Sequence, residues 1–208
     1  MLDYLKENNL DENTIVIYTS DQGFYLGEHG WFDKRWMYEP SFRMPFMIKY
    51  PKKIKSKSVN NELIVNVDFA PTLLDLAGIK PPKDMQGESF KKQLFNKKHA
   101  KRDAVYYHYY EYPFWHKVQP HYGVRTERYK LIHYYYNMNE WELFDLDNDK
   151  DELNNLYGKD GYNNITEDLK EMLKKLQSKY KDDMSLEEMR KMTDTRIKRV
   201  YKEMNSKK

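Results

Sequence analysis

The side chains best suited to chemistry in this 208-residue sequence follow one β-branched run near its N-terminus. Residues 14–18, Thr-Ile-Val-Ile-Tyr, lead into a glycine-punctuated loop that carries Ser20, Asp21 and Gln22. Asp21 and Gln22 offer adjacent carboxylate and amide oxygens, which are hard ligands suited to Ca²⁺ or Mg²⁺. Lys34 follows in the same loop region and could bring a cation that holds an anionic group. These residues predict a site that binds a hard metal ion beside an anion.

An α/β element must position this loop. The β-branched run at residues 14–19 predicts a buried strand of a parallel α/β sheet, in which sites lie at the carboxyl ends of the strands. Residues 42–50 form a second candidate strand, which Pro51 closes. A buried strand needs a neighbour on each side, and residues 1–98 supply only a few candidates. We therefore expect an unpaired sheet edge in this half of the chain.

Two helices are predicted in the same half. Residues 2–9 have the pattern of the end of an amphipathic helix. A second helix is predicted after Asp68, which suits the N-cap position, and it should end at Gly78. Its apolar positions are Leu73, Leu74, Leu76 and Ala77.

The composition changes near residue 100 to a tyrosine-rich stretch. Strand signals separated by turns predict an antiparallel sheet, with strands at residues 104–110, 122–126, 129–136 and 141–145. Apolar residues at helical spacing over residues 165–180 predict a helix that packs on this sheet, and a fraying peripheral helix is expected beyond Lys181. The predicted fold class is α/β for residues 1–98, followed by a small α+β subdomain at residues 99–208.

The composition excludes several classes of protein. The 36 basic and 33 acidic residues give a net charge of +3, and the lysines are interspersed with acidic residues, so nucleic acid is not an expected partner. The absence of cysteine excludes disulfides and thiolate metal sites but leaves the compartment open. The first apolar stretch is interrupted by charges and is not a signal peptide, and no later stretch is long enough to span a membrane.

Three ordered blocks of sequence resemble the type I sulfatases, which hydrolyse sulfate esters on an alkaline-phosphatase-like α/β fold. The first block, residues 14–51, contains Tyr-Thr-Ser-Asp-x-Gly, Gly-Glu-His-Gly and Asp-Lys-Arg-x-x-Tyr-Glu. The second is Val-Asp-Phe-Ala-Pro-Thr-Leu-Leu-Asp-Leu-Ala-Gly at residues 67–78, and the third extends over residues 123–156. The resemblance implies that residues 1–98 are the C-terminal part of the sulfatase catalytic α/β domain and residues 99–208 the C-terminal subdomain.

The resemblance also implies roles for the first group of residues. Asp21 would be a ligand of the family's divalent cation, usually Ca²⁺, and Gln22 stands where relatives carry Asn, Gln or His. Lys34 stands at the position of a lysine that contacts the ester sulfate and stabilises the charge developing there. Arg35 is expected to be structural, pairing with Glu39 or a neighbouring loop. Without the resemblance, Asp21 and Gln22 could simply cap a helix or turn.

Three histidines are candidates for substrate contact. His29 could be a hydrogen-bond donor behind the site, a substrate contact or an ordinary loop residue. Because the family's C-terminal subdomain lines the substrate pocket, His116 and His121 could recognise sugar hydroxyls. The alternative for these two residues is a structural aromatic cluster with Tyr112 and Trp115.

The family's nucleophile is a formylglycine made from Cys or Ser in a C/S-x-P-S/A-R motif, and the sequence contains no such motif. The resemblance therefore implies the C-terminal part of a sulfatase, inactive as this chain alone. Its substrate would be a sulfated carbohydrate of the glycosaminoglycan or mucin type, such as N-acetylglucosamine-6-sulfate. The missing N-terminal sulfatase portion would be its partner, and the full-length protein would be periplasmic or secreted.

Two other functions stay open at this point. One is a stand-alone, non-catalytic module that contacts carbohydrate, or a pseudoenzyme. The other is a phosphatase or phosphodiesterase of the same superfamily. Those enzymes usually bring Asp-His metal pairs for zinc, whereas Asp21 and Gln22 favour one hard cation.

Overall fold

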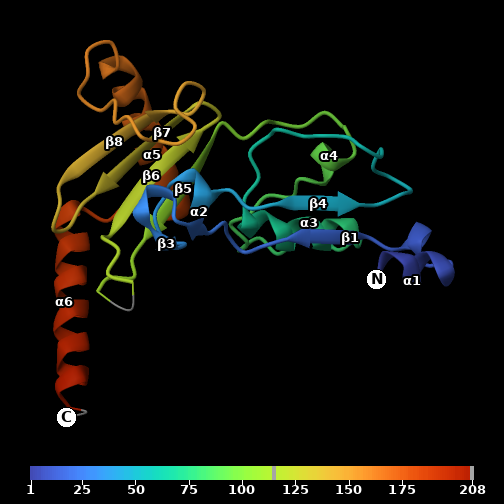
Figure 1. Cartoon of the computed structure of the whole chain (residues 1–208), viewed down its shortest axis with the longest axis horizontal. Helices are drawn as coiled ribbons and strands as arrows, with labels where there is room; N and C mark the ends of the chain where they lie inside the picture. Colours follow the sequence, from blue (N-terminus) through green and yellow to red (C-terminus); the bar gives the residue numbers. More distant parts are fainter. Residues whose placement is uncertain (114–115, 207–208) are drawn as a thin grey trace. The chain divides into compact units, whose positions relative to one another are not determined.

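The computed structural model of the chain describes residues 1–113 and 116–206. It separates into two compact units, the first comprising Met1–Gly23 and Arg43–Arg102 and the second Phe24–Phe42 and Asp103–Lys208. Figure 1 shows the elements of both units. The sequence placed residues 24–42 with the N-terminal half, whereas compactness groups them with the C-terminal half. The reason is that this segment packs on the C-terminal sheet, as described below.

The first unit contains one small antiparallel sheet and short helices. Its elements are α1 (Leu2–Glu7), η1 (Asp11–Asn13), β1 (Val16–Thr19), β4 (Phe46–Lys49), η3 (Asn66–Asp68), α3 (Phe69–Leu76) and α4 (Lys91–Leu94). Strand β1 pairs with β4 in antiparallel register, whereas a parallel neighbour was expected for β1. Among the described residues these two strands form a two-stranded sheet, and the expected unpaired edge is present.

Strand β1 is also less buried than its apolar composition predicted. Val16 and Ile17 are half-buried, and Thr19 is exposed. Tyr18 is 63% exposed, and Met47, its partner across the ladder, is 61% exposed. One face of this ribbon therefore carries two large apolar side chains that the described residues leave uncovered.

Helix α3 forms where the sequence predicted it, with Asp68 at the N-cap position and Gly78 just beyond its end at φ 78°. The Asp68 carboxylate is not the cap, because it instead accepts hydrogen bonds from the backbone N–H groups of Val65 and Glu88. The same carboxylate pairs with both terminal nitrogens of Arg102. Asp68 therefore ties the start of α3 to two distant segments of the first unit.

The second unit is built on a four-stranded antiparallel sheet in the order β5-β6-β7-β8. Its strands are β5 (Ala104–Tyr109), β6 (His121–Thr126), β7 (Tyr129–Tyr134) and β8 (Glu140–Asp145), and the four predicted strands are thereby confirmed. The other elements are β2 (Tyr25–Leu26), η2 (Glu28–Gly30), β3 (Phe32–Asp33), α2 (Glu39–Phe42), α5 (Asn163–Tyr180) and α6 (Leu186–Asn205).

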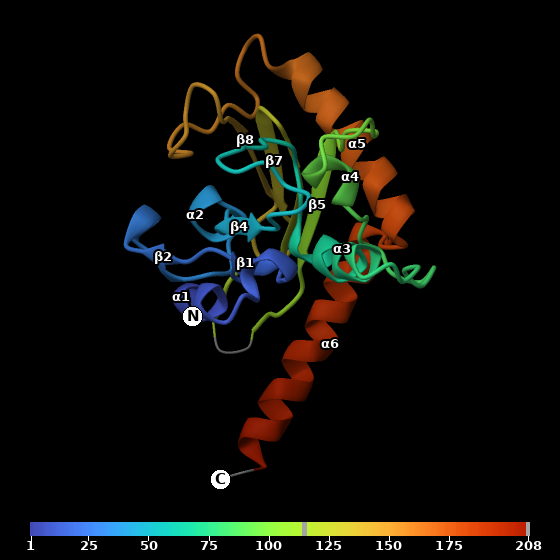
Figure 2. The same ribbon diagram turned by 90° about the vertical axis from the view of Figure 1, so that its right-hand side faces the viewer.

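Alternating side chains of this sheet make two separate cores. On one face Val124, Leu131 and Leu143 pack with Leu169 of α5 and Met189 of α6. Figure 2 shows α5 lying along the strands. Two helices therefore pack where the sequence predicted one, because the first half of α6 buries Met189 and Thr193.

No helix among the described residues is long and apolar enough to cross a bilayer.

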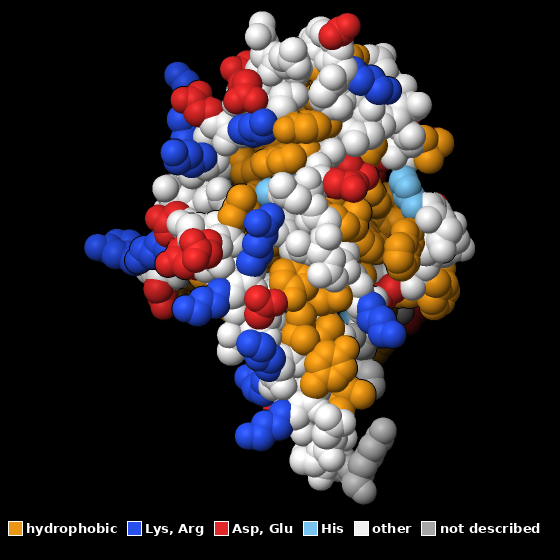
Figure 3. All heavy atoms as spheres, turned by 90° about the vertical axis from the view of Figure 1, so that its left-hand side faces the viewer, with side chains coloured by type: hydrophobic (Ala, Val, Ile, Leu, Met, Phe, Trp, Pro, Cys, Tyr) orange, Lys and Arg blue, Asp and Glu red, His pale blue; other side chains and the backbone are white. Residues whose placement is uncertain are grey.

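The second half of α6 is different, because it keeps apolar side chains exposed. Tyr201 and Met204 are each 59% exposed. Figure 3 shows hydrophobic side chains beside lysines and arginines on this face of the second unit. Isolated apolar residues of this kind are common on protein surfaces.

Segment 24–42 covers the other face of the sheet. Met37 is fully buried in a cluster with Ile132, Tyr134 and Phe144. A Cβ atom built on Gly123 would lie 2.6 Å from the Met37 sulfur and 2.4 Å from the Leu131 carbonyl oxygen. Glycine at position 123 therefore provides the space that Met37 fills.

Candidate functional site

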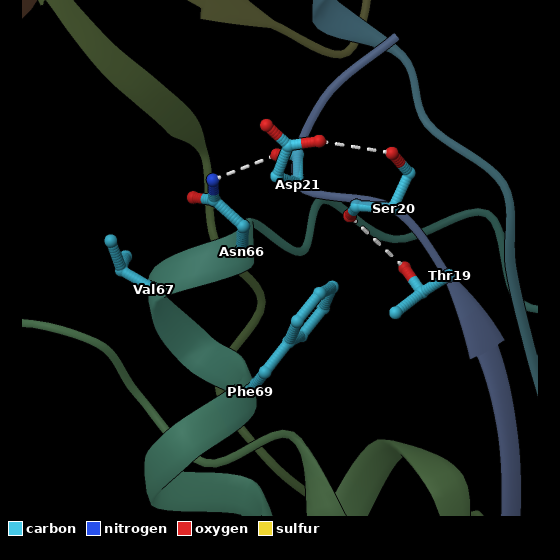
Figure 4. A pocket seen from close by; sticks show the side chains of 6 residues that line it. All are labelled: Thr19, Ser20, Asp21, Asn66, Val67 and Phe69. Carbon is cyan, nitrogen blue, oxygen red and sulfur yellow. Dashed lines mark hydrogen bonds between the residues drawn. The ribbon is translucent and has the colours of Figure 1, made fainter.

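The loop after β1 carries the predicted metal ligands and borders an open pocket of the first unit. The pocket is lined by Thr19, Ser20, Asp21, Asn66, Val67 and Phe69. Figure 4 shows Asp21 between Ser20 of the same loop and Asn66 at the start of η3. The Ser20 hydroxyl donates a hydrogen bond of 3.1 Å to the Asp21 carboxylate. The Asn66 side-chain amide donates one of 2.9 Å to the Asp21 carbonyl oxygen, which anchors the loop to the start of η3.

The donor atoms in this loop suit calcium in type but not in number. Asp21 is exposed and Gln22 is half-buried, and both carry oxygen donors. Calcium takes six to eight oxygen ligands. Among residues 1–113 and 116–206, no cluster of three or more His, Asp or Glu side chains could hold a metal ion. Asp21 and Gln22 are therefore at most a part of a calcium site.

Lys34 lies in the second unit, on the segment that covers the sheet. It is half-buried and follows Asp33, whose φ of 142° is one that L-residues rarely adopt. Backbone strain of this kind is characteristic of functional loops. Two tyrosine hydroxyls fix the chain just after Lys34: Tyr107 donates to the Arg35 carbonyl oxygen at 2.8 Å and Tyr25 donates to the Trp36 carbonyl oxygen at 3.2 Å.

Asp33, Arg35 and His116 form a closed triangle of charged and polar groups next to Lys34. Arg35 donates to Asp33 Oδ1 at 2.9 Å and to His116 Nε2 at 2.8 Å, and His116 Nδ1 contacts Asp33 Oδ2. Because arginine can only donate, His116 Nε2 is the acceptor, and the ring proton is on Nδ1. These side chains keep 21–27% of their surface exposed, so the triangle is accessible to a ligand.

The triangle corrects one assignment and contains a residue that the sequence did not single out. Arg35 was expected to pair with Glu39 or a neighbouring loop; Glu39 pairs instead with Lys130 and Arg125, and Arg35 bonds His116 of a loop distant in sequence. Asp33 was overlooked. Its position two residues before Arg35 only weakly indicates a pair of the two side chains. The contact with His116 could not be predicted from a local pattern, because Arg35 and His116 are 81 residues apart in the sequence.

His121, which the sequence grouped with His116, has a different environment. It begins β6 and is 0% exposed. The rings of Trp36, Tyr107, Tyr109 and Tyr134 surround it at centroid distances of 5.4–5.6 Å. Burial lowers the pKa of His121 to about 4, and its Nδ1 bonds the Gln119 carbonyl oxygen at 2.8 Å. The cluster is aromatic, as the alternative expected, but its members differ: Tyr112 packs against Tyr136, with centroids 5.6 Å apart, and Trp115 lies outside the described residues.

His29 lies in η2 of the second unit with φ of 53°. Its half-buried ring stacks on Tyr38, with centroids 4.5 Å apart and an angle of 11° between the planes. The Tyr38 hydroxyl in turn donates to Glu142 at 2.7 Å. A substrate contact by His29 stays a prediction, and this stacking is its observed role.

Comparison with known proteins places the chain among sulfatases. Residues 27–179 match the family described as N-sulphoglucosamine sulphohydrolase, C-terminal. An N-acetylglucosamine-6-O-sulfatase of Bacteroides thetaiotaomicron is 51% identical over 185 residues, which cover 88% of this chain and 33% of that protein. An extracellular sulfatase SULF-1 homolog of Drosophila melanogaster is 41% identical over 100 residues, which cover 48% of this chain and 9% of that protein.

The structure gives the same result. The protein BT4656, solved with its substrate D-glucosamine-2-N,6-O-disulfate, superposes with a TM-score of 0.85 at 50% identity. The match covers 89% of this chain and 38% of that one. The chain thus spans about a third of the length of the relatives that it matches over most of its own sequence.

Proposed function

The chain belongs to the sulfatase family as its C-terminal region, and on that premise we propose that it serves in the hydrolysis of sulfate esters on a sulfated carbohydrate. The observation that carries the proposal is the match over residues 27–179, which contains the triangle of Asp33, Arg35 and His116. The proposed substrate class is a glycosaminoglycan or mucin glycan that bears 6-O-sulfated glucosamine. The names of two relatives about 50% identical to this chain support this class.

The triangle would recognise the hydroxyl groups of the sugar ring. A carboxylate and a guanidinium side by side present acceptors and donors at fixed positions, which suits the vicinal hydroxyls of a sugar. His116, with its proton on Nδ1, would offer Nε2 as a further acceptor when Arg35 turns to the ligand. The partial exposure of all three side chains supports this role.

Lys34 would contact the ester sulfate, because it stands where similar sulfatases carry a sulfate-contacting lysine and its side chain ends in a cation. A preorganised cation stabilises the negative charge that develops on the sulfate and the leaving oxygen. Calcium, when bound, would be held in part by the oxygens of Asp21 and Gln22, and it would supply positive charge that attracts an anionic group. We further propose that the full-length protein is periplasmic or secreted, in keeping with the extracellular Drosophila relative.

A non-catalytic carbohydrate-contacting module is the second candidate, and two observations favour it for the 208-residue chain alone. The sequence contains no C/S-x-P-S/A-R motif. Its described residues also assemble no cluster of three metal-ligating side chains. The triangle, by contrast, is complete within the second unit, so recognition of the sugar does not depend on the first unit.

A chimera tests the proposal. This chain would replace the corresponding region of the Bacteroides thetaiotaomicron N-acetylglucosamine-6-O-sulfatase, to which it is 51% identical. We expect the chimera to release sulfate from D-glucosamine-2-N,6-O-disulfate, and Asp33→Ala or His116→Ala to raise KM more than they lower kcat. Folded chimera that releases no sulfate would reject the enzymatic function. Sugar binding by the 208-residue chain, lost in Asp33→Ala, would then support the non-catalytic module.

A further inference from the structure

A buried cluster of charges joins segment 24–42 to the sheet of the second unit. The Lys130 ammonium is 0% exposed and lies 2.9 Å from a carboxylate oxygen of Glu39 and 2.7 Å from Oε1 of Glu152. Arg125 contacts Glu39 at 3.3 Å. The side chain of Glu152 is also 0% exposed. Charges buried this deeply require close partners, and here two carboxylates share two cations.

Glu152 makes one further contact, which sets it apart from the rest of the cluster. Its Oε2 accepts a hydrogen bond of 2.5 Å from the backbone N–H of Glu39, the first residue of α2. Glu152 itself has φ of 52°, in the left-handed region that is unfavourable for residues other than glycine. The fold thus maintains a strained backbone that delivers this carboxylate to the segment carrying Lys34 and Arg35.

Three contacts fix the backbone of this segment after Lys34. Tyr107 holds the Arg35 carbonyl, Tyr25 holds the Trp36 carbonyl and Glu152 holds the Glu39 N–H. On the other side of Lys34, β3 pairs with the two-residue strand β2, whose Tyr25 is fully buried opposite Asp33 and whose Leu26 is 76% exposed. The position of Lys34 and Arg35 therefore depends on the three anchors that follow them together with the pairing of β2 and β3.

We propose that Glu152 is a positioning residue of the sulfatase site, which sets the place of Lys34 and of the triangle through the Glu39 backbone and Lys130. The role of Glu152 in the site rests on the proposed function, but its effect on the backbone of residues 35–39 can be measured independently of that function. Glu152 touches no substrate and acts only through the segment that does.

The chemistry of the contact distinguishes glutamate from its amide. Oε1 faces the Lys130 ammonium and Oε2 faces the Glu39 N–H, so both positions require an acceptor. Glutamine has one acceptor oxygen, and its NH₂ group would face one of the two donors. Glu152→Gln should therefore retain one contact and lose the other, whereas Glu152→Ala loses both.

The test uses the 208-residue chain and amide hydrogen exchange resolved by residue. In Glu152→Ala we expect the amides of residues 35–39 to exchange at least roughly tenfold faster, relative to those of β6, because the N–H of Glu39 loses a charged acceptor. Glu152→Gln should fall between this variant and the wild type. The matched control is Asp145→Asn, which disturbs another buried carboxylate of the same unit, paired with Arg128 at 2.7 Å.

The outcomes separate positioning from plain stabilisation. If residues 35–39 exchange no faster in Glu152→Ala than in Asp145→Asn at matched unfolding free energy, the proposal is rejected. Should Glu152→Ala fail to fold, exchange rates in Glu152→Gln that equal those of the wild type across all of residues 35–39 reject it as well.

Titration with D-glucosamine-2-N,6-O-disulfate adds the functional readout. A wild-type chain that binds no sugar counts against the proposed function and leaves the exchange result standing. If the wild type binds, a folded Glu152→Ala should bind roughly tenfold more weakly. Unchanged affinity with a loosened segment would overturn the positioning role.

Discussion

Replacing Gly123 by alanine should destabilise the second unit severely, and the structure gives the scale. The added Cβ would lie 2.4 Å from the Leu131 carbonyl oxygen, 2.6 Å from the Met37 sulfur and 3.2 Å from the Ile132 Cα. The first contact is with the backbone of β7, which is held by its pairing with β8 on the other side. Met37 is fully buried and packs among Ile132, Tyr134 and Phe144. Overpacking of this kind lowers the free energy of unfolding by about 1–3 kcal/mol. Because the obstacle here is backbone, which moves less easily than a side chain, we expect a loss of about 3 kcal/mol or more.

The free energy of unfolding, measured by urea denaturation with tryptophan fluorescence, checks this value. A loss of about 3 kcal/mol corresponds to a fall in Tm of roughly 6–12 °C for a chain of this size. Gly158→Ala is the control, since its Cβ would meet no atom within 4 Å while its φ of 73° still strains alanine. That strain costs about 1–2 kcal/mol. If Gly123→Ala is no more destabilising than Gly158→Ala, the close packing of segment 24–42 on β6 is refuted.

Three other predictions concern pH, catalysis and activity. Burial lowers the pKa of His121 and of His133 to about 4, so both histidines bind protons more readily when the chain unfolds. The contribution of the two neutral histidines to the free energy of unfolding should be complete above about pH 6.5. It should fall by up to roughly 3 kcal/mol for each histidine as the pH drops towards 4. In urea titrations, His121→Phe should make this fall smaller. In the chimera, Lys34→Ala should lower kcat/KM by roughly a hundredfold with Tm unchanged, and near-normal turnover would show that another residue contacts the sulfate. The 208-residue chain should not hydrolyse 4-methylumbelliferyl sulfate and should bind Ca²⁺ only weakly by calorimetry, because Asp21 and Gln22 supply too few ligands; genuine turnover would contradict the missing-nucleophile argument.

The sheet of the second unit could be predicted because its determinants are local. Strand signals at β6 and β7 are separated by the two-residue turn at residues 127–128, and the structure pairs Arg125 with Lys130 across that turn. Helix α5 was predicted for the same reason, since Leu169 and Leu173 recur at helical spacing and both are buried. Where the pattern that specifies a helix or strand is complete within a few residues, the sequence is sufficient to predict that element.

The packing of segment 24–42 could not be predicted, because its determinants are distant in sequence. Met37 fills the space above Gly123, and the Glu39 N–H meets a carboxylate 113 residues away. The candidate site shows the same limit. Lys34 was selected by its spacing from Asp21, but the partners of Arg35 and the burial of His121 depend on contacts that no local pattern encodes.

The closed triangle of Asp33, Arg35 and His116 has a thermodynamic consequence for any ligand that it receives. Both ring nitrogens of His116 already have partners, so a sugar hydroxyl reaches this ring by exchange of hydrogen bonds and not by addition. An exchange adds little enthalpy, but it incurs little ordering entropy because the three side chains are already fixed. An analogue that lacks the hydroxyl leaves the internal bond in place and forfeits only the small gain of the exchange. This hydroxyl alone therefore gives weak discrimination, and the triangle acts mainly by keeping its three side chains in position before the ligand arrives.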